Sequence, residues 1–191
     1  MEQLENIKLY NGDCMEYLKT VPDKYFELAI VDPPYGINFA KSHTGKGWIV
    51  RESKEWDLSI PSKEYFEELF RVSKNQIIWG GNYMVQYLIP SMGWILWDKG
   101  QRNFSLADGE LAFTSFNRAL RIFTYSRAKL NKLRGEHPTE KPVALYKWLL
   151  KNYAKQGDKI LDTHFGSLSI GIACHDMGFD LTACELDKDY Y

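Results

Sequence analysis

The feature that most constrains this chain is the stretch from Phe26 to Gly36, which reads FELAIVDPPYG. An apolar run, Leu28 to Val31, is followed at once by an aspartate, two prolines and a tyrosine. A short apolar run of this kind predicts a buried, parallel strand. Two prolines cannot donate to a sheet ladder, so the strand must end at Asp32. The pattern therefore places a carboxylate at the carboxyl end of a strand, where open α/β sheets bind their ligands.

The residues at this strand end suit chemistry on the amino group of a nucleobase. Such an amine is a poor nucleophile because its lone pair is conjugated into the ring. Asp32 can accept one amino hydrogen and the carbonyl of Pro33 the other, which turns the lone pair toward an electrophile. Pro33 and Pro34 make the turn rigid, and Tyr35 offers a ring on which a base can stack. The alternative interpretation is a proline-rich turn with an incidental tyrosine.

The size and composition of the chain predict one soluble domain. Its 191 residues, 45% of them hydrophobic, suffice for a single sizeable core. The net charge is −1, so a nucleic-acid footprint must be local. The three cysteines have no metal-site spacing with one another or with the histidines, which indicates thiols of a reducing compartment. Because we find no leader and no run of membrane length, we expect a cytoplasmic protein without membrane partners.

Apolar periodicity predicts strands and helices that alternate along the chain. Besides the strand before Asp32, the expected strands are Ile7–Tyr10, Gln76–Trp79, Trp94–Trp97, Lys159–Thr163 and Asp180–Glu185, and the expected helices are Met15–Thr20, Pro61–Lys74, a short one ending at Leu88, Pro142–Lys155 and Ser169–Met177. Two further segments, Leu111–Phe116 and Leu120–Tyr125, resemble a hairpin. We therefore expect a single doubly wound α/β domain with a mostly parallel sheet and a late antiparallel hairpin.

The segment from Asp158 to Glu185 predicts a βαβ unit that can bind a nucleoside. Its first strand ends at Asp162, a turn with Gly166 and Ser167 opens a helix, and its second strand ends at Glu185. Glu185 follows Gly166 at close to the spacing of about 20 residues at which an acid meets a ribose. The GxGxxG pattern of nicotinamide cofactors is absent, since this turn reads GSLSIG. An ordinary βαβ connection is the alternative.

A second candidate ligand site is the segment HPTEKP, which directly precedes the expected helix at Pro142. Thr139 offers a hydroxyl and Lys141 a cation close to the helix N-terminus. Together they form a natural seat for a carboxylate, such as that of a methionine. The alternative is a capped helix start with solvated charge.

Four motifs, DPPY, HPTEKP, DTHFGS and CELDKDYY, occur in this order along the chain. In this combination the chain resembles the β-class amino-methyltransferases of DNA, strongly over residues 7–36 and 137–191 and loosely over residues 77–125. The resemblance implies a Rossmann-like, S-adenosylmethionine-dependent methyltransferase of a bacterial or phage-infected cell. Its catalytic half would span about residues 1–100, a candidate recognition insert about 100–136, and the cofactor-binding half about 137–191.

The resemblance also implies roles for individual residues. Those that hold the flipped-out base are Asp32, Pro33, Pro34 and Tyr35. Those that hold the cofactor are Asp13 near the adenine, Glu185 at the ribose, and Asp162, Gly166, Ser167, Thr139 and Lys141 around the methionine part. On its own residue pattern, Asp13 is the N-cap of a helix. The DPPY motif is similar to that of the adenine-modifying members, whereas cytosine-modifying members more often begin with serine.

One position departs from the family pattern. Leu168 stands where the family usually has a second glycine, which lets the backbone approach the cofactor. The leucine side chain must either face the core or crowd the cofactor. We expect crowding and a weak cofactor affinity.

Two stretches are candidates for binding DNA. Between Glu110 and Glu136 the sequence has no acidic residue. Basic and aromatic residues alternate there, and the basic ones include Arg118, Arg121, Arg127 and Lys129. This stretch is suited to phosphate binding, with a solvated run of charge as the alternative. The segment 37–61 is long and aperiodic, and it could fill or clamp the gap that a flipped base leaves.

Three functions stay open at this point. The leading one is site-specific transfer of a methyl group from S-adenosylmethionine to the N6 amino group of adenine in double-stranded DNA, by a monomer or a homodimer. The second is methylation of N4 of cytosine, of an amino group in RNA or of a protein glutamine. The third is a catalytically silent nucleic-acid-binding protein that has lost cofactor binding at Leu168.

Overall fold

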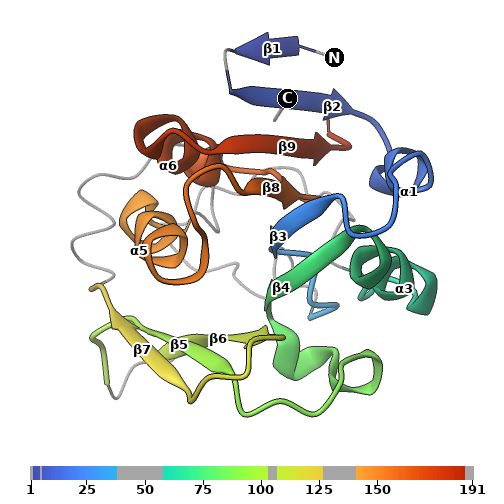
Figure 1. The fold of residues 1–191 in the computed structure, drawn as a ribbon. Coiled ribbons are helices and arrows are strands. Elements are labelled where there is room, and N and C mark those ends of the chain that lie inside the picture. Colours follow the sequence, from blue (N-terminus) through green and yellow to red (C-terminus); the bar gives the residue numbers. More distant parts are fainter. Residues whose placement is uncertain (1, 5, 38–57, 103–106, 127–140, 188–191) are drawn as a thin grey trace, which may run out of the picture.

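The computed structural model describes residues 2–4, 6–37, 58–102, 107–126 and 141–187. The strands of these residues form one nine-stranded sheet in the order β1-β2-β9-β8-β3-β4-β6-β5-β7 (Figure 1). Strands β1 to β9 span Glu2–Leu4, Ile7–Asn11, Phe26–Val31, Ser73–Trp79, Trp94–Asp98, Gly109–Thr114, Arg121–Thr124, Lys159–Asp162 and Asp180–Glu185. The helices are α1 (Cys14–Leu18), α3 (Lys63–Val72), α5 (Val143–Tyr153) and α6 (Ser169–Met177), with 3-10 turns η2 (Gly81–Tyr83) and η3 (Val85–Tyr87).

The middle of the sheet is a parallel block made of β2, β9, β8, β3 and β4. Two strands of the described sheet, β1 and β6, run against the others. From β3 the chain proceeds through α3 to β4 on one side, whereas from β8 it proceeds through α6 to β9 on the other. The switch point of this topology therefore lies between β3 and β8, where ligands of doubly wound sheets bind. The expected doubly wound, mostly parallel α/β fold is confirmed.

Helices cover both faces of the sheet, with α5 and α6 on one face and α1 and α3 on the other (Figure 1). Residues of β3 enter the two cores in alternation. Leu28 and Ile30 pack on the side of α5 and α6, whereas Ala29 and Val31 pack on the side of α1 and α3. Successive side chains of a strand point to opposite faces, and here both faces are covered. The strand that precedes Asp32 is therefore apolar without alternation.

Helix α3 passes into β4 without a loop. Its buried residues, Tyr65, Phe66, Leu69 and Val72, follow the helical spacing that the sequence showed. At Ser73 the backbone becomes extended, and the Ser73 hydroxyl donates to the carbonyl of Leu69 at 2.5 Å. The helix thus ends slightly earlier, and the strand begins slightly earlier, than the sequence predicted.

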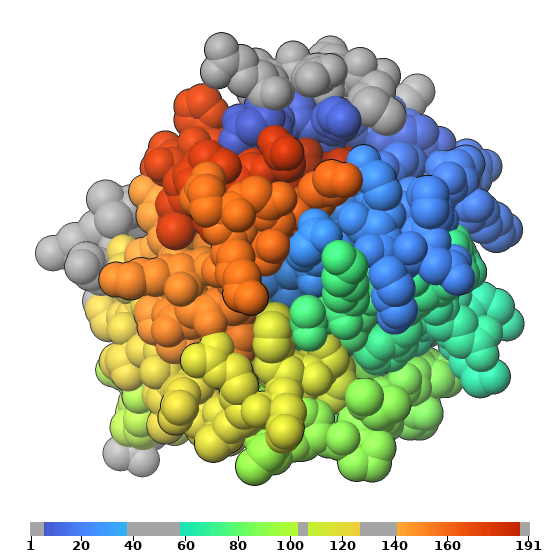
Figure 2. Space-filling view, in the orientation of Figure 1, coloured from blue at the N-terminus to red at the C-terminus, as the bar shows by residue number. Residues whose placement is uncertain are grey.

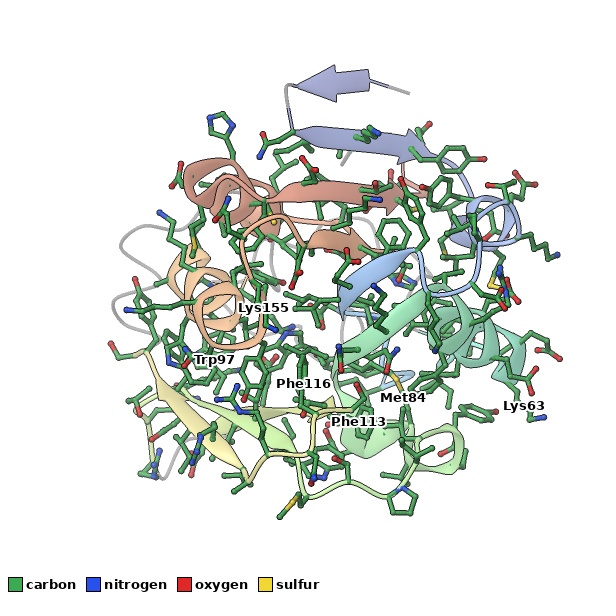
Figure 3. The ribbon with its side chains drawn as sticks, in the orientation of Figure 1. Lys63, Met84, Trp97, Phe113, Phe116 and Lys155 are labelled. Carbon is green, nitrogen blue, oxygen red and sulfur yellow. The ribbon has the colours of Figure 1, made fainter. Side chains whose placement is uncertain are left out.

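Segments far apart in the sequence meet at the centre of the molecule. Residues near 30, in blue, lie against residues near 160, in orange (Figure 2), as the pairing of Leu28 with Ile160 requires. The 3-10 turns after β4 fold back toward β6, where Figure 3 shows Met84 close to Phe113. Both side chains are fully buried in the same core cluster.

The expected hairpin of Leu111–Phe116 with Leu120–Tyr125 is wrong in its pairing. Strand β6 bonds to β4 on one edge and to β5 on the other, so that no edge remains for β7. Strand β7 lies instead on the outer edge of β5 and runs parallel to it. The antiparallel hairpin of this region is formed by β5 and β6, closed by a hydrogen bond of 2.9 Å from the Lys99 amide to the Asp108 carbonyl.

Arg71, in the last turn of α3, ties this helix to the chain that follows α1. Its guanidinium donates to the carbonyls of Leu18 at 2.9 Å and Val21 at 2.7 Å. It also forms ion pairs with Asp23 and Glu68, each at 2.7 Å. One planar cation thus joins two elements of the same face of the sheet.

Replacing Arg71 with alanine should lower the free energy of unfolding by about 1–3 kcal/mol, because two backbone carbonyls lose a charged donor. The matched control is Lys63→Ala. Lys63 pairs with Glu67 at 2.8 Å, but its side chain is 70% exposed at the surface end of α3 (Figure 3), so its loss should cost at most about 0.5 kcal/mol. Urea unfolding followed by circular dichroism compares the variants, and equal losses would show that Arg71 acts only as a surface charge.

Candidate active site

Asp32 follows the last residue of β3, at the switch point of the sheet. Strand β3 is bonded to β4 on one edge and β8 on the other, which fixes the position of its carboxyl end. The chain then leaves the sheet through Pro33, which is buried, and Pro34, which is half-buried. The Asp32 side chain is 24% exposed. Its location at a strand end is the one that the sequence predicted.

Both carboxylate oxygens of Asp32 are engaged. The Tyr35 hydroxyl donates to Oδ1 at 2.7 Å, and the ammonium of Lys141 contacts Oδ2. The Lys141 ammonium also lies 3.3 Å from the Tyr35 hydroxyl. Lys141 was expected at the cofactor carboxylate, and the structure brings it to the carboxylate of Asp32. Its role toward the cofactor stays a prediction.

Lys141 belongs to a chain of alternating charges that continues through Glu110 to Lys99. Its Nζ lies 3.3 Å from Glu110 Oε2, and Lys99 Nζ lies 2.5 Å from Glu110 Oε1. Burial opposes the ammonium of Lys141, but the carboxylates of Asp32 and Glu110 outweigh it and raise its pKa. Burial likewise opposes the carboxylate of Glu110, but Lys141 and Lys99 hold its pKa below the usual range. Lys141 and Glu110 therefore stay charged at neutral pH.

The ring of Tyr35 is held between neighbours. It stacks on Tyr83 with ring centroids 5.3 Å apart and an interplanar angle of 18°. Gly80, which has a φ of 67°, lies so close that an added Cβ would stand 2.2 Å from the Tyr35 ring. Burial, followed by the charges of Asp32 and Glu110, raises the pKa of Tyr35 well above its usual value. The hydroxyl is therefore a permanent donor, and the ring has a fixed orientation.

A second carboxylate site lies at the neighbouring strand ends of β8, β9 and β2. Glu185 Oε2 accepts the amide hydrogen of Gly166 at 2.9 Å, and Oε1 accepts that of Asp187 at 2.8 Å. Gly166 has a φ of 50°, in the left-handed region. Asp13 caps α1 by accepting from the Met15 amide at 2.9 Å, which confirms the N-cap interpretation. Its place near a cofactor adenine stays a prediction.

Asp162 lies between the two carboxylate sites. It is 2% exposed, and Oδ1 accepts the amide hydrogen of His164 at 3.0 Å. Burial raises its pKa to about 8, the His164 amide opposes this rise, and the charges of Asp32 and Glu185 add to it. Asp162 is therefore largely protonated at neutral pH. Ser167, on the turn that follows, donates to the Ser169 hydroxyl at 3.2 Å.

Leu168 is the N-cap of α6 and has a φ of 63°, a left-handed conformation that costs a residue with a Cβ about 1–2 kcal/mol. Its side chain is 47% exposed, so the alternative in which it faces the core is wrong. The family glycine at this position is explained by the backbone conformation as well as by space for a ligand. Crowding of the cofactor stays a prediction.

The structure describes only two of the four residues predicted to bind DNA. Arg121 is exposed at the start of β7, the edge strand. Arg118 is exposed too, but it donates to the Asn152 carbonyl at 2.6 Å and lies 5.1 Å from the Tyr153 ring centroid, so it also holds the end of α5. The other two, Arg127 and Lys129, lie outside the described residues, as does most of the segment 37–61. Thr139, which was predicted to bind the cofactor, also lies outside them.

Sequence reasoning missed three residues of the site: Lys99, Glu110 and Gly80. Two signals were available: a glutamate inside one apolar strand, and a lysine directly after the end of another strand. Charged residues at such positions are rarely buried without partners. Among the described residues, no group of histidine, cysteine, aspartate and glutamate side chains could hold a metal ion. No described helix combines the length and apolar character needed to cross a bilayer.

A doubly wound sheet with carboxylates gathered at its switch point defines a Rossmann-like α/β protein whose ligands bind at the strand ends. Solved structures share this fold. A complex of M1.HpyAVI with SAM superposes with a TM-score of 0.65 at 17% identity, covering 96% of this chain and 95% of that one. The PvuII DNA methyltransferase, described as cytosine-N4-specific, gives a TM-score of 0.65 at 14% identity over 98% and 84% of the two chains.

Sequence comparison agrees with the fold. The type II methyltransferase M2.DpnII of Streptococcus pneumoniae is 23% identical over 95% of this chain and 85% of its own length. The type II methyltransferase M.HpaI of Haemophilus parainfluenzae is 23% identical over 96% of this chain and 71% of its own length. The family model described as DNA methylase matches residues 78–191. The chain belongs to this N6/N4 DNA methylase family.

Replacing Leu168 with glycine should raise the free energy of unfolding by roughly 0.5–1 kcal/mol, because relief of the left-handed strain exceeds the entropic cost of glycine. Leu168→Ala is the matched control, since alanine shortens the side chain but keeps the strained Cβ. If the leucine crowds the cofactor, both variants should bind S-adenosylmethionine more tightly in calorimetric titration, and only glycine should stabilise the fold. Unchanged binding by both variants would remove the crowding hypothesis.

The protonation of Asp162 predicts how stability depends on pH. The folded protein keeps this proton up to about pH 8, whereas the unfolded chain loses it near about pH 4. Between these values the unfolded state binds fewer protons, so the contribution of Asp162 to stability falls as pH rises. Asp162→Asn mimics the protonated acid and should be more stable than the wild type by roughly 2–4 kcal/mol at pH 8, but not at pH 4. If the difference in melting temperature between the two proteins is the same at pH 4 and at pH 8, the shifted pKa of Asp162 is contradicted.

Proposed function

We propose that this chain methylates the N6 amino group of adenine in double-stranded DNA. The carrying observation is the Asp-Pro-Pro-Tyr turn at the end of β3, directly beside the glycine-and-carboxylate site at the ends of β8 and β9. The two sites meet where the sheet topology switches, so that a base and a nucleoside cofactor would face each other across β3 and β8. Membership in the DNA methylase family supports the reaction class. The chemistry of each of the two sites indicates which molecule it would bind.

S-adenosylmethionine supplies an electrophilic methyl group when bound, and the residues at the ends of β8 and β9 fit it. Both oxygens of Glu185 are held by backbone amides, which fixes a carboxylate that can accept from the two ribose hydroxyls. The left-handed Gly166 has no Cβ and lets a ligand approach the turn before α6. Around the methionine part we place Asp162, Gly166, Ser167, Thr139 and Lys141, and we place Asp13 near the adenine.

The Asp32 turn acts on the target amine. Asp32 would accept one amino hydrogen and the carbonyl of Pro33 the other, which localises the nitrogen lone pair. The Asp32 carboxylate would also balance the positive charge that grows on this nitrogen. Tyr35, whose ring is fixed by Tyr83 and Gly80, would stack on the base. This arrangement requires the adenine to leave the helix stack.

DNA phosphates would bind to the basic stretch that includes Arg118, Arg121, Arg127 and Lys129, and the segment 37–61 would clamp the space left by the base. Such an enzyme fits a cytoplasmic restriction-modification system of a bacterium or its phage. It would act as a monomer or as a homodimer.

The second candidate function is methylation of cytosine at N4. The shared fold of the cytosine-N4-specific PvuII enzyme is the observation that favours it. The aspartate at the first position of the DPPY motif favours adenine instead. Transfer to RNA or to a protein glutamine, and a silent binder weakened at Leu168, are the remaining alternatives.

The test is transfer of a labelled methyl group from S-adenosylmethionine to DNA, followed by chromatography of the nucleosides. We expect N6-methyladenine, and N4-methylcytosine or an unlabelled product would contradict the proposal. Asp32→Ala and Asp32→Asn should lower the transfer rate by at least about 100-fold, because neither side chain can balance the growing charge. Asp180→Asn is the matched control, since Asp180 is exposed at the opposite end of β9. Near-normal turnover by Asp32→Asn would remove the role of this carboxylate.

A further inference from the structure

The chain of charges from Lys99 to Asp32 has an unusual property for an active site, because its central cation is almost completely buried. The Lys141 side chain is 3% exposed, and its ammonium lies between the carboxylates of Asp32 and Glu110. It also stands 5.2 Å from the ring centroid of Trp79 and 5.8 Å from that of Tyr35. Two lysines and two carboxylates balance one another in charge.

This arrangement limits what Asp32 can offer a target amine. Asp32 Oδ1 accepts from the Tyr35 hydroxyl, and Oδ2 contacts the ammonium of Lys141. Each oxygen can still accept a second hydrogen bond, but a carboxylate paired with an ammonium balances the positive charge that grows on the amine less well. Asp32 regains that capacity when Lys141 withdraws. A buried ammonium cannot give up its counter-ion unless another one is already in place.

We propose that Glu110 is a positioning residue of the methyl-transfer site, which holds the ammonium of Lys141 when the target amine takes the Asp32 oxygen. This inference rests on the proposed function. The 3.3 Å between Lys141 Nζ and Glu110 Oε2 leaves room for the pair to tighten as Lys141 withdraws from Asp32. No net charge enters or leaves the buried site in this exchange, because the incoming amine is neutral.

Glu110 is built to stay in place during this exchange. It belongs to β6, which is bonded to β4 and β5 on its two edges, and it pairs in register with Trp97. Lys99 holds its second oxygen at 2.5 Å, and the Lys99 side chain is itself only 10% exposed and lies over the ring of Trp97 at 5.0 Å. The carboxylate is thus fixed by both the backbone and the side chains around it.

The other carboxyl group near Lys141 cannot take this role. Asp162 interacts with the Lys141 charge, but burial raises the pKa of Asp162 to about 8, so that it carries a proton at neutral pH. A protonated acid is no counter-ion. The buried Tyr146 hydroxyl is also neutral, since burial, followed by the charge of Asp32, raises its pKa well above the usual value. Glu110 is therefore the second counter-ion among the described residues around Lys141.

The test is the single-turnover rate of methyl transfer to DNA by Glu110→Gln, measured beside the dissociation constant for S-adenosylmethionine. Without the second counter-ion, Lys141 stays on Asp32, and the carboxylate balances the growing charge on the amine less well. We expect the rate at pH 7 to fall by at least about tenfold and the dissociation constant to change by less than about threefold. Glu27→Gln is the matched control, because Glu27 pairs with Lys74 at 2.9 Å on a different part of the sheet, and it should leave both quantities unchanged.

A pH series separates positioning from a general structural defect. In Glu110→Gln, Lys141 loses one of the two carboxylates that raise its pKa, and a deprotonated Lys141 releases Asp32. The rate of the variant relative to the wild type should therefore rise between about pH 7 and pH 10. Both proteins carry the other groups that face Lys141, which are Asp32, Tyr35, Tyr146 and Asp162.

The outcomes decide between the hypotheses. A rate within about threefold of the wild type, or a loss that pH does not reduce, would overturn the role of Glu110. If Glu110→Gln melts below the assay temperature, all proteins are assayed at a lower temperature at which circular dichroism shows the variant to be folded, and the same loss and the same recovery at high pH are expected. A wild-type protein that transfers no methyl group to DNA would overturn the proposed function, whereas an active wild type beside a fully active Glu110→Gln overturns only this inference.

Discussion

The pairing of β3 with β8 is the constraint on which the rest of this structure depends. These two strands are neighbours in the sheet, but the chain leaves them toward opposite sides, through α3 and through α6. Helices α3 and α6 pack on opposite faces of the sheet, and Asp32 and Asp162 come together at the carboxyl ends of the two strands. The same pairing explains the sequence before Asp32, because a strand covered on both faces has to be apolar throughout.

Bringing carboxylates together in a half-buried place has an electrostatic cost, and the structure meets it in two different ways. Around Asp32 the negative charge is balanced by a buried lysine that Glu110 and Lys99 hold in place. At Asp162 the charge of Lys141 only partly offsets burial, so the carboxyl group keeps its proton instead. The first solution surrounds Asp32 with buried ion pairs, whereas the second leaves Asp162 as a largely neutral hydrogen-bonding group.

Much of the fold could be predicted from the sequence, because most elements are specified by local patterns. Helix α6 and strand β9 have the expected bounds, and Asp13 caps α1 as its position suggested. The pairing of β7 could not be predicted. Its sequence is compatible with an antiparallel partner, but both edges of β6 are already occupied by β4 and β5. Which strand occupies which edge depends on the whole sheet, so the sequence of a short segment does not indicate its partner.

The sequence by itself determined where the carboxylates at the strand ends stand, since prolines and glycines end strands by rules that act over a few residues. It also indicated the turn around Gly166. Only the tertiary structure decided which charges meet. Lys141 and Glu110 approach Asp32 from elements that follow it by roughly a hundred and by roughly eighty residues, and no local pattern links them. The left-handed backbone of Leu168 was likewise hidden, because a leucine carries no local signal for that conformation.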